Sequence, residues 1–312
     1  MLRRPLLLRA PLGNAGGLCR RFFLSCETRH PSLGVHMLFV PLDRLTSMGN
    51  LKLLFFVPVL ALAADQTSLV VTSAASPQLG IAPDSLASVF GPNIATVTKA
   101  AGAPPWPTAL GDMTSVTITD SANHQQNALL LFVSPNQMNI YLPPGLATGP
   151  AILSFPTTGL PPGVGTAALR NVPVTLGKVA PALFSMSGTG SGVAAATGVR
   201  QVISTHAQGP VPVFQCDTSG ACTAVPIDPG VDAPVFLSFY GTGIRGASAL
   251  ENVSVKIGNV TLKPTYAGPQ SQTPGLDQIN VPLDLSLRGA GLVNVTVMID
   301  GVTSNAVQVN IQ

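Results

Sequence analysis

Two segments of the chain carry the same order of side chains and so restrict how it can fold. Gln137 and Asn139 in SPNQMNIYLPPG recur 141 residues later as Gln278 and Asn280 in GLDQINVPLDLS, with apolar residues and a Pro following in both. Phe90-Gly91 likewise matches Tyr240-Gly241 at an offset of 150. Offsets that drift in this way are typical of loop insertions. The pattern predicts two related units, residues 65–178 and 179–312.

The composition indicates which kind of unit is repeated. Only 9% of the residues are charged, and 31 Gly and 29 Pro are spread along the chain. Long surface helices need charged outer faces and tolerate Pro poorly. Short alternating runs rich in Val and Thr, separated by Gly, Pro, Asn and Ser, are instead typical of β-sandwiches. We expect an all-β fold of two tandem immunoglobulin-like β-sandwich domains after an N-terminal leader.

The N-terminal region has the features of an export signal. Residues 48–64 combine Lys52, an apolar run at 53–62 and a small-residue cleavage site at Ala63, which predicts a signal peptide. The run is shorter than the ~20 residues that span a bilayer, although a buried strand or a membrane anchor is the alternative. Residues 1–47 are rich in Arg and Leu, and we expect a non-native or disordered extension there, with an organellar presequence as the alternative.

These features predict a secreted protein of the extracellular space or cell envelope, with no transmembrane span in the mature chain. Residues 65–312 hold eight basic and eleven acidic residues and no basic run. Nucleic-acid binding needs a concentrated positive surface, so that class of partner is not expected.

The cysteines divide into two pairs. Cys19 and Cys26 lie in the upstream extension, whereas Cys216 and Cys222 enclose five turn-forming residues. In an exported chain such a pair predicts a disulfide that closes a hairpin tip, and free thiols are the alternative. A zinc site would need two further ligands.

Several phrases together are similar to one family. They are SVFGPNIA, VSPNQMNIYLPPGLATGPAIL, APALFSMSGTGSGVAAA, LSFYGTGI, VKIGNVTLKPTYAGP, GLDQINVPL and DGVTSNAVQVNIQ. The chain resembles the acidobacterial Solibacter-type uncharacterised C-terminal domain family over about residues 70–312. The resemblance implies a bacterial, secreted, two-part module of immunoglobulin-like (IPT/TIG-type) sandwiches without a known activity. Members usually follow other domains, whereas this module follows the leader directly, so an activity supplied upstream is not expected.

No catalytic set emerges from the ionisable residues. His124 and His206 lie in loop-like segments, and no Gly-x-Ser-x-Gly elbow accompanies them. Asp228 and Asp232 flank a Pro-Gly turn, and we interpret them as turn-forming residues. Together with Asp217 they form the alternative of a calcium site, although the dense Asp/Asn pattern of a dedicated loop is missing. We expect no catalytic residue, no metal and no cofactor.

Two further motifs have a structural and a functional interpretation. Gly188, Gly190 and Gly192 lack the spacing of a phosphate-binding loop, which favours a flexible turn between the units. The Gln–Asn pairs place two amides on one face of a strand. They either satisfy backbone groups beside a Pro-rich turn or form a hydrogen-bonding stripe for sugar hydroxyls, and their recurrence favours the structural role.

The function expected from these features is a non-catalytic interaction or adhesion-type module, whose partner is an unknown protein or polysaccharide at the cell exterior. The alternative is a carbohydrate- or matrix-binding accessory protein. That alternative needs exposed aromatic platforms, and the candidates are Trp106, Tyr141, Tyr240 and Tyr266. An extracellular hydrolase is the third interpretation, for which a convergent catalytic set is missing.

Overall fold

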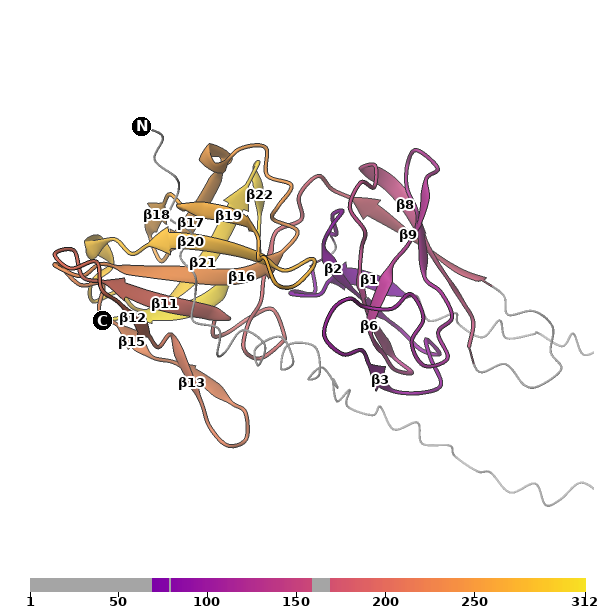
Figure 1. The fold of residues 1–312 in the computed structure, drawn as a ribbon, viewed down its shortest axis with the longest axis horizontal. Helices are drawn as coiled ribbons and strands as arrows, with labels where there is room; N and C mark the ends of the chain where they lie inside the picture. The colour runs from indigo at the N-terminus through magenta and orange to yellow at the C-terminus, as the bar shows by residue number, and fades with distance from the viewer. Residues whose placement is uncertain (1–68, 79, 159–168) are drawn as a thin grey trace, which may run out of the picture. The chain divides into compact units, whose positions relative to one another are not determined.

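The computed structural model describes residues 69–78, 80–158 and 169–312, which all fall within one compact unit (Figure 1). Strands make up most of the regular structure there, and the helical segments are two three-residue 3-10 turns, η1 (Leu250–Asn252) and η2 (Leu285–Leu287). The expected all-β fold is therefore confirmed. The predicted signal peptide with Ala63, the upstream extension, and Cys19 and Cys26 lie outside the described residues.

The N-terminal half forms two antiparallel sheets that enclose one core, here called the N-terminal sheet pair. One sheet has the order β1 (Val70–Ser73), β2 (Leu86–Phe90), β7 (Gln137–Tyr141), β6 (Leu129–Val133) and β3 (Lys99–Ala100). The other has the order β5 (Gln125–Asn127), β4 (Thr117–Thr119), β8 (Gly149–Pro156) and β9 (Leu169–Leu176). Their core extends from Ile81 to Leu176 and includes the fully buried Met138, Ile140 and Phe155.

The C-terminal half forms a second pair of sheets, the C-terminal sheet pair. One sheet has the order β12 (Gln208–Val211), β11 (Ala196–Gln201), β16 (Val235–Thr242), β20 (Asp277–Pro282) and β19 (Tyr266–Pro269), and β10 (Ala182–Leu183) also pairs with β16. The other has the order β15 (Pro226–Ile227), β23 (Val307–Ile311), β21 (Gly291–Ile299), β17 (Val253–Ile257) and β18 (Val260–Leu262), and β22 (Val302–Thr303) pairs with β21.

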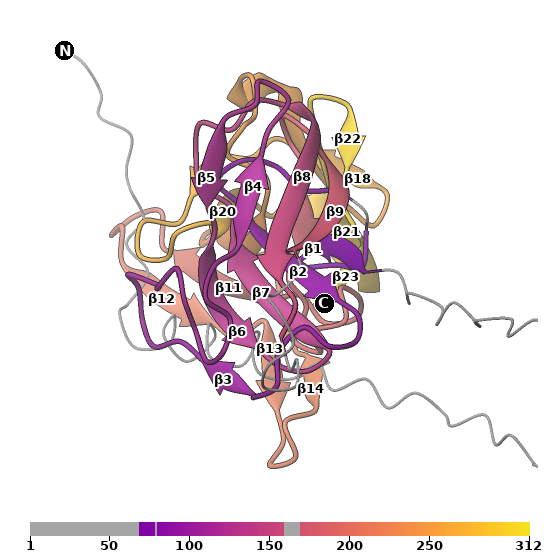
Figure 2. The same ribbon diagram turned by 90° about the vertical axis from the view of Figure 1, so that its right-hand side faces the viewer.

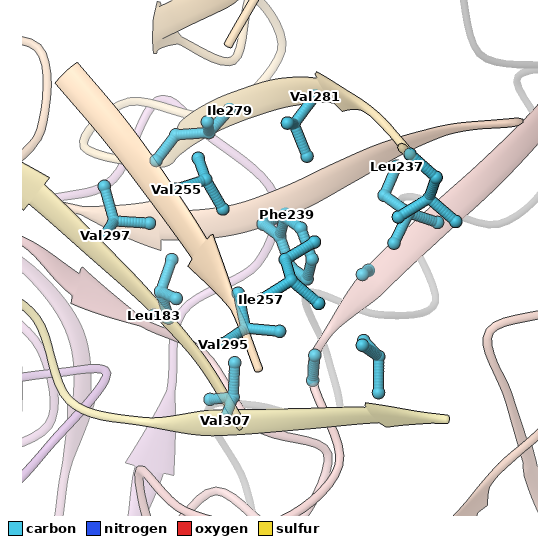
Figure 3. Packing of buried hydrophobic residues seen from close by; sticks show 14 of the residues in the cluster. Leu183, Leu237, Phe239, Val255, Ile257, Ile279, Val281, Val295, Val297 and Val307 are labelled. Atoms are coloured by element: carbon cyan, nitrogen blue, oxygen red, sulfur yellow. The ribbon is translucent and has the colours of Figure 1, made fainter. Parts of the chain in front are cut away.

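Alternation along the strands builds the core of the second pair. In β17, Val253, Val255 and Ile257 are buried while Lys256 is exposed. Figure 3 shows side chains of both sheets packed together, with Phe239 at the centre of the view. Burying each such side chain contributes roughly 1.5–3 kcal/mol, so the period of two selects which face of each strand points inward.

The two sheet pairs share a strand order. The order β2, β7, β6 in one matches β16, β20, β19 in the other, and β5, β4, β8, β9 matches β18, β17, β21, β23. The registers agree as well, since Ser88 lies opposite Asn139 and Ser238 lies opposite Asn280. The immunoglobulin-like assignment, the boundary at 178/179 and a common origin of the halves stay predictions that these correspondences support.

A small hairpin stands apart from the larger sheets. Among the described strands, β13 (Phe214–Cys216) and β14 (Cys222–Ala224) pair only with each other, and Figures 1 and 2 show them extending away from the larger sheets. Cys216 and Cys222 lie opposite each other and are joined by a disulfide with an S–S distance of 1.98 Å. The predicted disulfide at a hairpin tip is confirmed.

The glycine-rich segment differs from expectation. It forms the turn between β10 and β11 inside the C-terminal sheet pair, rather than a connection between the units. The Gly190 N–H donates to Ser185 Oγ at 3.1 Å, and Asn305 Nδ2 donates to the Gly190 carbonyl at 2.6 Å. A Cβ at Gly190, where φ is +78°, would lie 2.8 Å from the Cα of Ser76. The glycine is therefore required by close packing.

Candidate functional site

The two Gln–Asn pairs form matching side-chain clusters. Ser88 Oγ donates to Asn139 Oδ1 at 2.8 Å, and Gln137 Nε2 donates to the same oxygen at 2.9 Å. Ser238 Oγ donates to Asn280 Oδ1 at 2.8 Å, and Gln278 Nε2 does so at 2.7 Å. Each cluster joins two adjacent strands of its sheet, β2 to β7 in one and β16 to β20 in the other.

This geometry favours the structural interpretation, but the groups that the amides bond differ from those expected. The asparagine oxygens accept from side chains on their own and the neighbouring strand, and not from a backbone group of the Pro-rich turn. Asn139 and Asn280 are buried, so a sugar hydroxyl would have to displace bonds that are already made. The partner serines could have been found from the sequence, because the 150-residue offset pairs Ser88 with Ser238.

Charged side chains of the two sheet pairs meet in a second cluster, the junction network. Arg245 Nη1 lies 2.8 Å from Asp84 Oδ1, and Arg245 Nε lies 2.6 Å from Asp277 Oδ1. The Tyr141 hydroxyl donates to Asp84 Oδ1 at 2.6 Å. Asp277 Oδ2 accepts the Ile244 N–H at 2.7 Å. Arginine offers a planar fork of donors, and here that fork engages one carboxylate from each sheet pair.

Burial sets the ionisation of this network. Burial raises the pKa of the Asp277 carboxyl, against the attraction of Arg245 and the bonds the carboxylate accepts. Burial alone would lower the pKa of the Arg245 guanidinium, but Asp277 and Asp84 outweigh it, so that pKa lies above its usual value. Burial and the bond to Asp84 raise the pKa of the Tyr141 phenol. Desolvation thus disfavours the charged form of the fully buried Asp277 carboxyl, while the Arg245 guanidinium stays charged.

An apolar cluster lies beside the junction network. It joins Leu86, Trp106 and Leu131 of the N-terminal pair to Phe184 and Tyr240 of the C-terminal pair. Trp106 and Tyr240 are buried, and the ring centroids of Trp106 and Tyr141 lie 6.3 Å apart. Three of the four aromatic residues considered as sugar platforms therefore serve this junction. The fourth, Tyr266, is half-buried and donates its hydroxyl to the Pro269 carbonyl at 2.6 Å.

A groove of about 920 Å³ lies on the N-terminal sheet pair, between β1 and β9. These strands end their respective sheets and lie side by side in Figures 1 and 2. Apolar side chains such as Val71, Val172 and Val174 line the groove, together with Val70 and Ile152, which are 40% and 46% exposed. Asp120, Ser121 and Asn123 line it as well and add polar groups.

The corresponding edge of the C-terminal pair is covered by strands. The pairings Gly149–Leu176 and Gly291–Ile311 align β9 with β23. β23 pairs on its outer side with β15 at Asn310–Ile311, and Val193 bridges Gln308. In the described residues the outer side of β9 is bridged at Leu176 by Ile81, and the stretch from Val172 to Thr175 lines the groove. The groove therefore lies where the other half of the chain holds additional strands.

The ionisable residues weighed for chemistry do not converge. His124 and His206 are exposed, and His124 Nδ1 lies 3.8 Å from Asp120, whose carboxylate caps a turn. Asp217 accepts N–H groups within the hairpin tip, and Asp228 pairs with Arg288 at 3.3 Å. Over the described ranges there is no group of three or more metal-binding side chains. Nor does that part of the chain contain a helix long and apolar enough to cross a membrane.

Sequence reasoning missed the junction network and the groove. The signal for the network was a difference between the repeats, because Arg245 and Asp277 stand where the first half has Ala95 and Asn136. The groove had no such signal, since it depends on which edge strands are covered. Comparison of the chain with family models and with curated proteins gave no match.

Proposed function

We propose that this protein is a secreted or cell-surface, non-catalytic binding module that takes an extended segment of a partner protein into the groove between β1 and β9. The observation that carries the proposal is that no described strand pairs with the outer side of β9, at the place where β23 is covered by β15 and Val193. The C-terminal half thus indicates that a strand would complete the corresponding edge of the N-terminal half.

The chemistry of the groove is consistent with such a partner. An added strand gains main-chain hydrogen bonds from an edge and specificity from alternate side chains in apolar pockets. Val70, Ile152 and Val174 supply apolar surface for those side chains. Pro173 has no N–H, so one main-chain bond would be missing at that residue.

Binding to the envelope of the producing cell tests the proposal. Ile152→Lys and Val70→Lys place charges in the groove, and both should abolish binding of the purified protein to isolated envelopes. The matched control is Leu292→Lys, which changes an exposed apolar residue of β21 outside the groove and should bind like the original protein. Treating the envelopes with protease should remove the binding partner.

The carbohydrate- or matrix-binding alternative predicts the opposite pattern. Binding that survives protease but is lost after digestion of envelope polysaccharides would favour it, and groove variants that bind normally would reject the strand proposal. The alternative has less support because the aromatic side chains it needs lie at the junction or donate to the backbone. Secretion, the family resemblance and the lack of catalysis remain part of the proposal.

A further inference from the structure

We propose that Arg245 fixes the orientation of the two sheet pairs, and that without its bond to Asp84 the chain hinges at residues 177–181. The residues concerned belong to the junction network, and the inference does not depend on what the groove binds. It rests on three observations, namely the direction of the bonds, the packing of the connecting segment, and the difference between the repeats.

Two kinds of polar contact at the junction are directional, namely the bonds of Arg245 and the bond from the Leu86 N–H to the Thr242 hydroxyl at 2.8 Å. The apolar cluster at the junction holds the pairs together, but apolar burial has no preferred direction. The planar guanidinium instead bonds Asp84, Asp277 and the Leu276 carbonyl, and its donors point in fixed directions within that plane. Among the bonds of Arg245, rotation of one pair against the other would break the one to Asp84, because Asp277 and Leu276 belong to the same sheet pair as Arg245.

The connecting segment lies against the loop that carries Arg245. The Ala180 N–H donates to the Gly243 carbonyl at 2.9 Å. A Cβ at Gly243 would lie 2.2 Å from the Ala180 carbonyl oxygen, and one at Gly246 would lie 2.2 Å from that of Lys178. The same loop begins after Thr242, whose hydroxyl accepts the Leu86 N–H at 2.8 Å. The end of β16 and the loop that follows it thus contact β2 and the hinge, respectively.

The loop after β2, which matches the loop after β16, shows which residues a sheet pair needs for its own folding. Ile94 and Ile244 are both fully buried, so this part of the loop serves the core in each half. Arg245 corresponds to Ala95, and Asp277 to Asn136. A sheet pair of this kind therefore folds without the two charges. Asp277 also accepts the Ile244 N–H within its own sheet pair at 2.7 Å, whereas the bond from Arg245 to Asp84 joins the two pairs.

Distances between spin labels on the two sheet pairs test the inference. The full chain with Cys19→Ser and Cys26→Ser receives labels at Gln125 on β5 and Thr261 on β18, which are exposed, while the disulfide stays intact. The original protein should give one narrow distance distribution. Arg245→Met and Asp84→Gly, which both remove the bond across the junction, should each give a broad distribution instead. The matched control Arg288→Met removes the pair with Asp228 inside the C-terminal sheet pair and should keep it.

A second variant, Asp84→Gly, keeps the test decisive if Arg245→Met fails to fold. Arg245→Met leaves Asp277 buried without its partner, whereas Asp84→Gly removes only the acceptor across the junction and preserves the Arg245–Asp277 pair, and Gly tolerates the positive φ of 56° at this position. If Arg245→Met does not unfold cooperatively in urea, Asp84→Gly alone decides. A narrow distribution in Asp84→Gly, or in a folded Arg245→Met, would overturn the inference.

Discussion

Asn139 and Asn280 hold the same position in two sheets of one chain. Each accepts a hydrogen bond from the serine directly opposite it, with the serine Oγ 2.8 Å from the asparagine Oδ1 in both cases. Each also accepts from the glutamine two residues earlier. A buried carbonyl oxygen with two donors links neighbouring strands through side chains in addition to the backbone ladder.

Replacing either asparagine should destabilise the fold to a similar degree. Asn139→Ala and Asn280→Ala each remove the oxygen that a serine and a glutamine share as an acceptor, where Ser88 is buried and Ser238 half-buried. A lost buried partner costs about 1–3 kcal/mol. Urea unfolding would measure the change in the free energy of unfolding. A cost at only one of the two positions would contradict the equivalence of the clusters.

The control for these variants is Gln215→Ala. Gln215 is an exposed amide residue in β13, and surface substitutions of this kind usually change stability by less than about 0.5 kcal/mol. A comparable loss in this control would mean that the asparagine effect reports strand propensity rather than the buried bonds.

The sequence predicted the fold class because its signals are local. Alternation in VSVKI of β17 and the turn residues between Cys216 and Cys222 each act within a few residues, and the structure confirms a strand and a disulfide-closed hairpin there. The repeat pattern also indicated which strands correspond, since Gln137 and Gln278 lie on β7 and β20.

The candidate site was less predictable because it depends on contacts between distant residues. Asp84 and Arg245 are 161 positions apart, and nothing around Asp84 distinguishes it from a turn aspartate. The groove depends on edge pairing, because Val193 bridges Gln308 whereas the corresponding stretch of β9 borders the groove. Pairing of this kind is long-range, so local propensity carries little information about it.

Gly275 should tolerate no side chain. Its φ is +73°, and a Cβ would lie 2.9 Å from Leu86 Cγ and 2.9 Å from Tyr141 Cδ2. Gly289 is a matched control because its φ is +77° and a Cβ there would meet no neighbouring atom within 4 Å. Gly289→Ala should lower the free energy of unfolding by about 1–2 kcal/mol through backbone strain alone. Gly275→Ala should lower it by about 1–3 kcal/mol more through overpacking. Equal decreases in melting temperature for the two variants would show that the junction can relax around the methyl group.

Asp120 should make stability depend on acid pH. The N–H of Ala147 donates to its carboxylate at 2.8 Å, and those of His124 and Ala122 each do so at 2.9 Å, which holds the pKa of Asp120 below its usual value. The contribution is therefore complete above the unfolded pKa of about 3.9 and is lost as the pH falls through the lower folded value.

The variant Asp120→Asn makes this dependence measurable. It removes the charge from the three bonds, so it should be less stable than the original protein at about pH 7, and the difference should shrink towards about pH 2 as the original carboxylate is protonated. Urea unfolding at several pH values gives the comparison. A stability difference that stays constant over this range would show that the carboxylate charge does not contribute.

Breaking the disulfide should loosen the hairpin and leave the two cores intact. A loop this short predicts an entropic stabilisation near the low end of ~2–4 kcal/mol. That stabilisation acts on β13 and β14, which pair with no other strand of the described ranges, so most of it should appear as local opening rather than in global unfolding. Cys216→Ser with Cys222→Ser should therefore speed proteolytic cleavage at residues 217–221, located by mass spectrometry, while the urea midpoint changes little. A large fall in that midpoint would mean that the hairpin supports the C-terminal core, which Phe214 contacts.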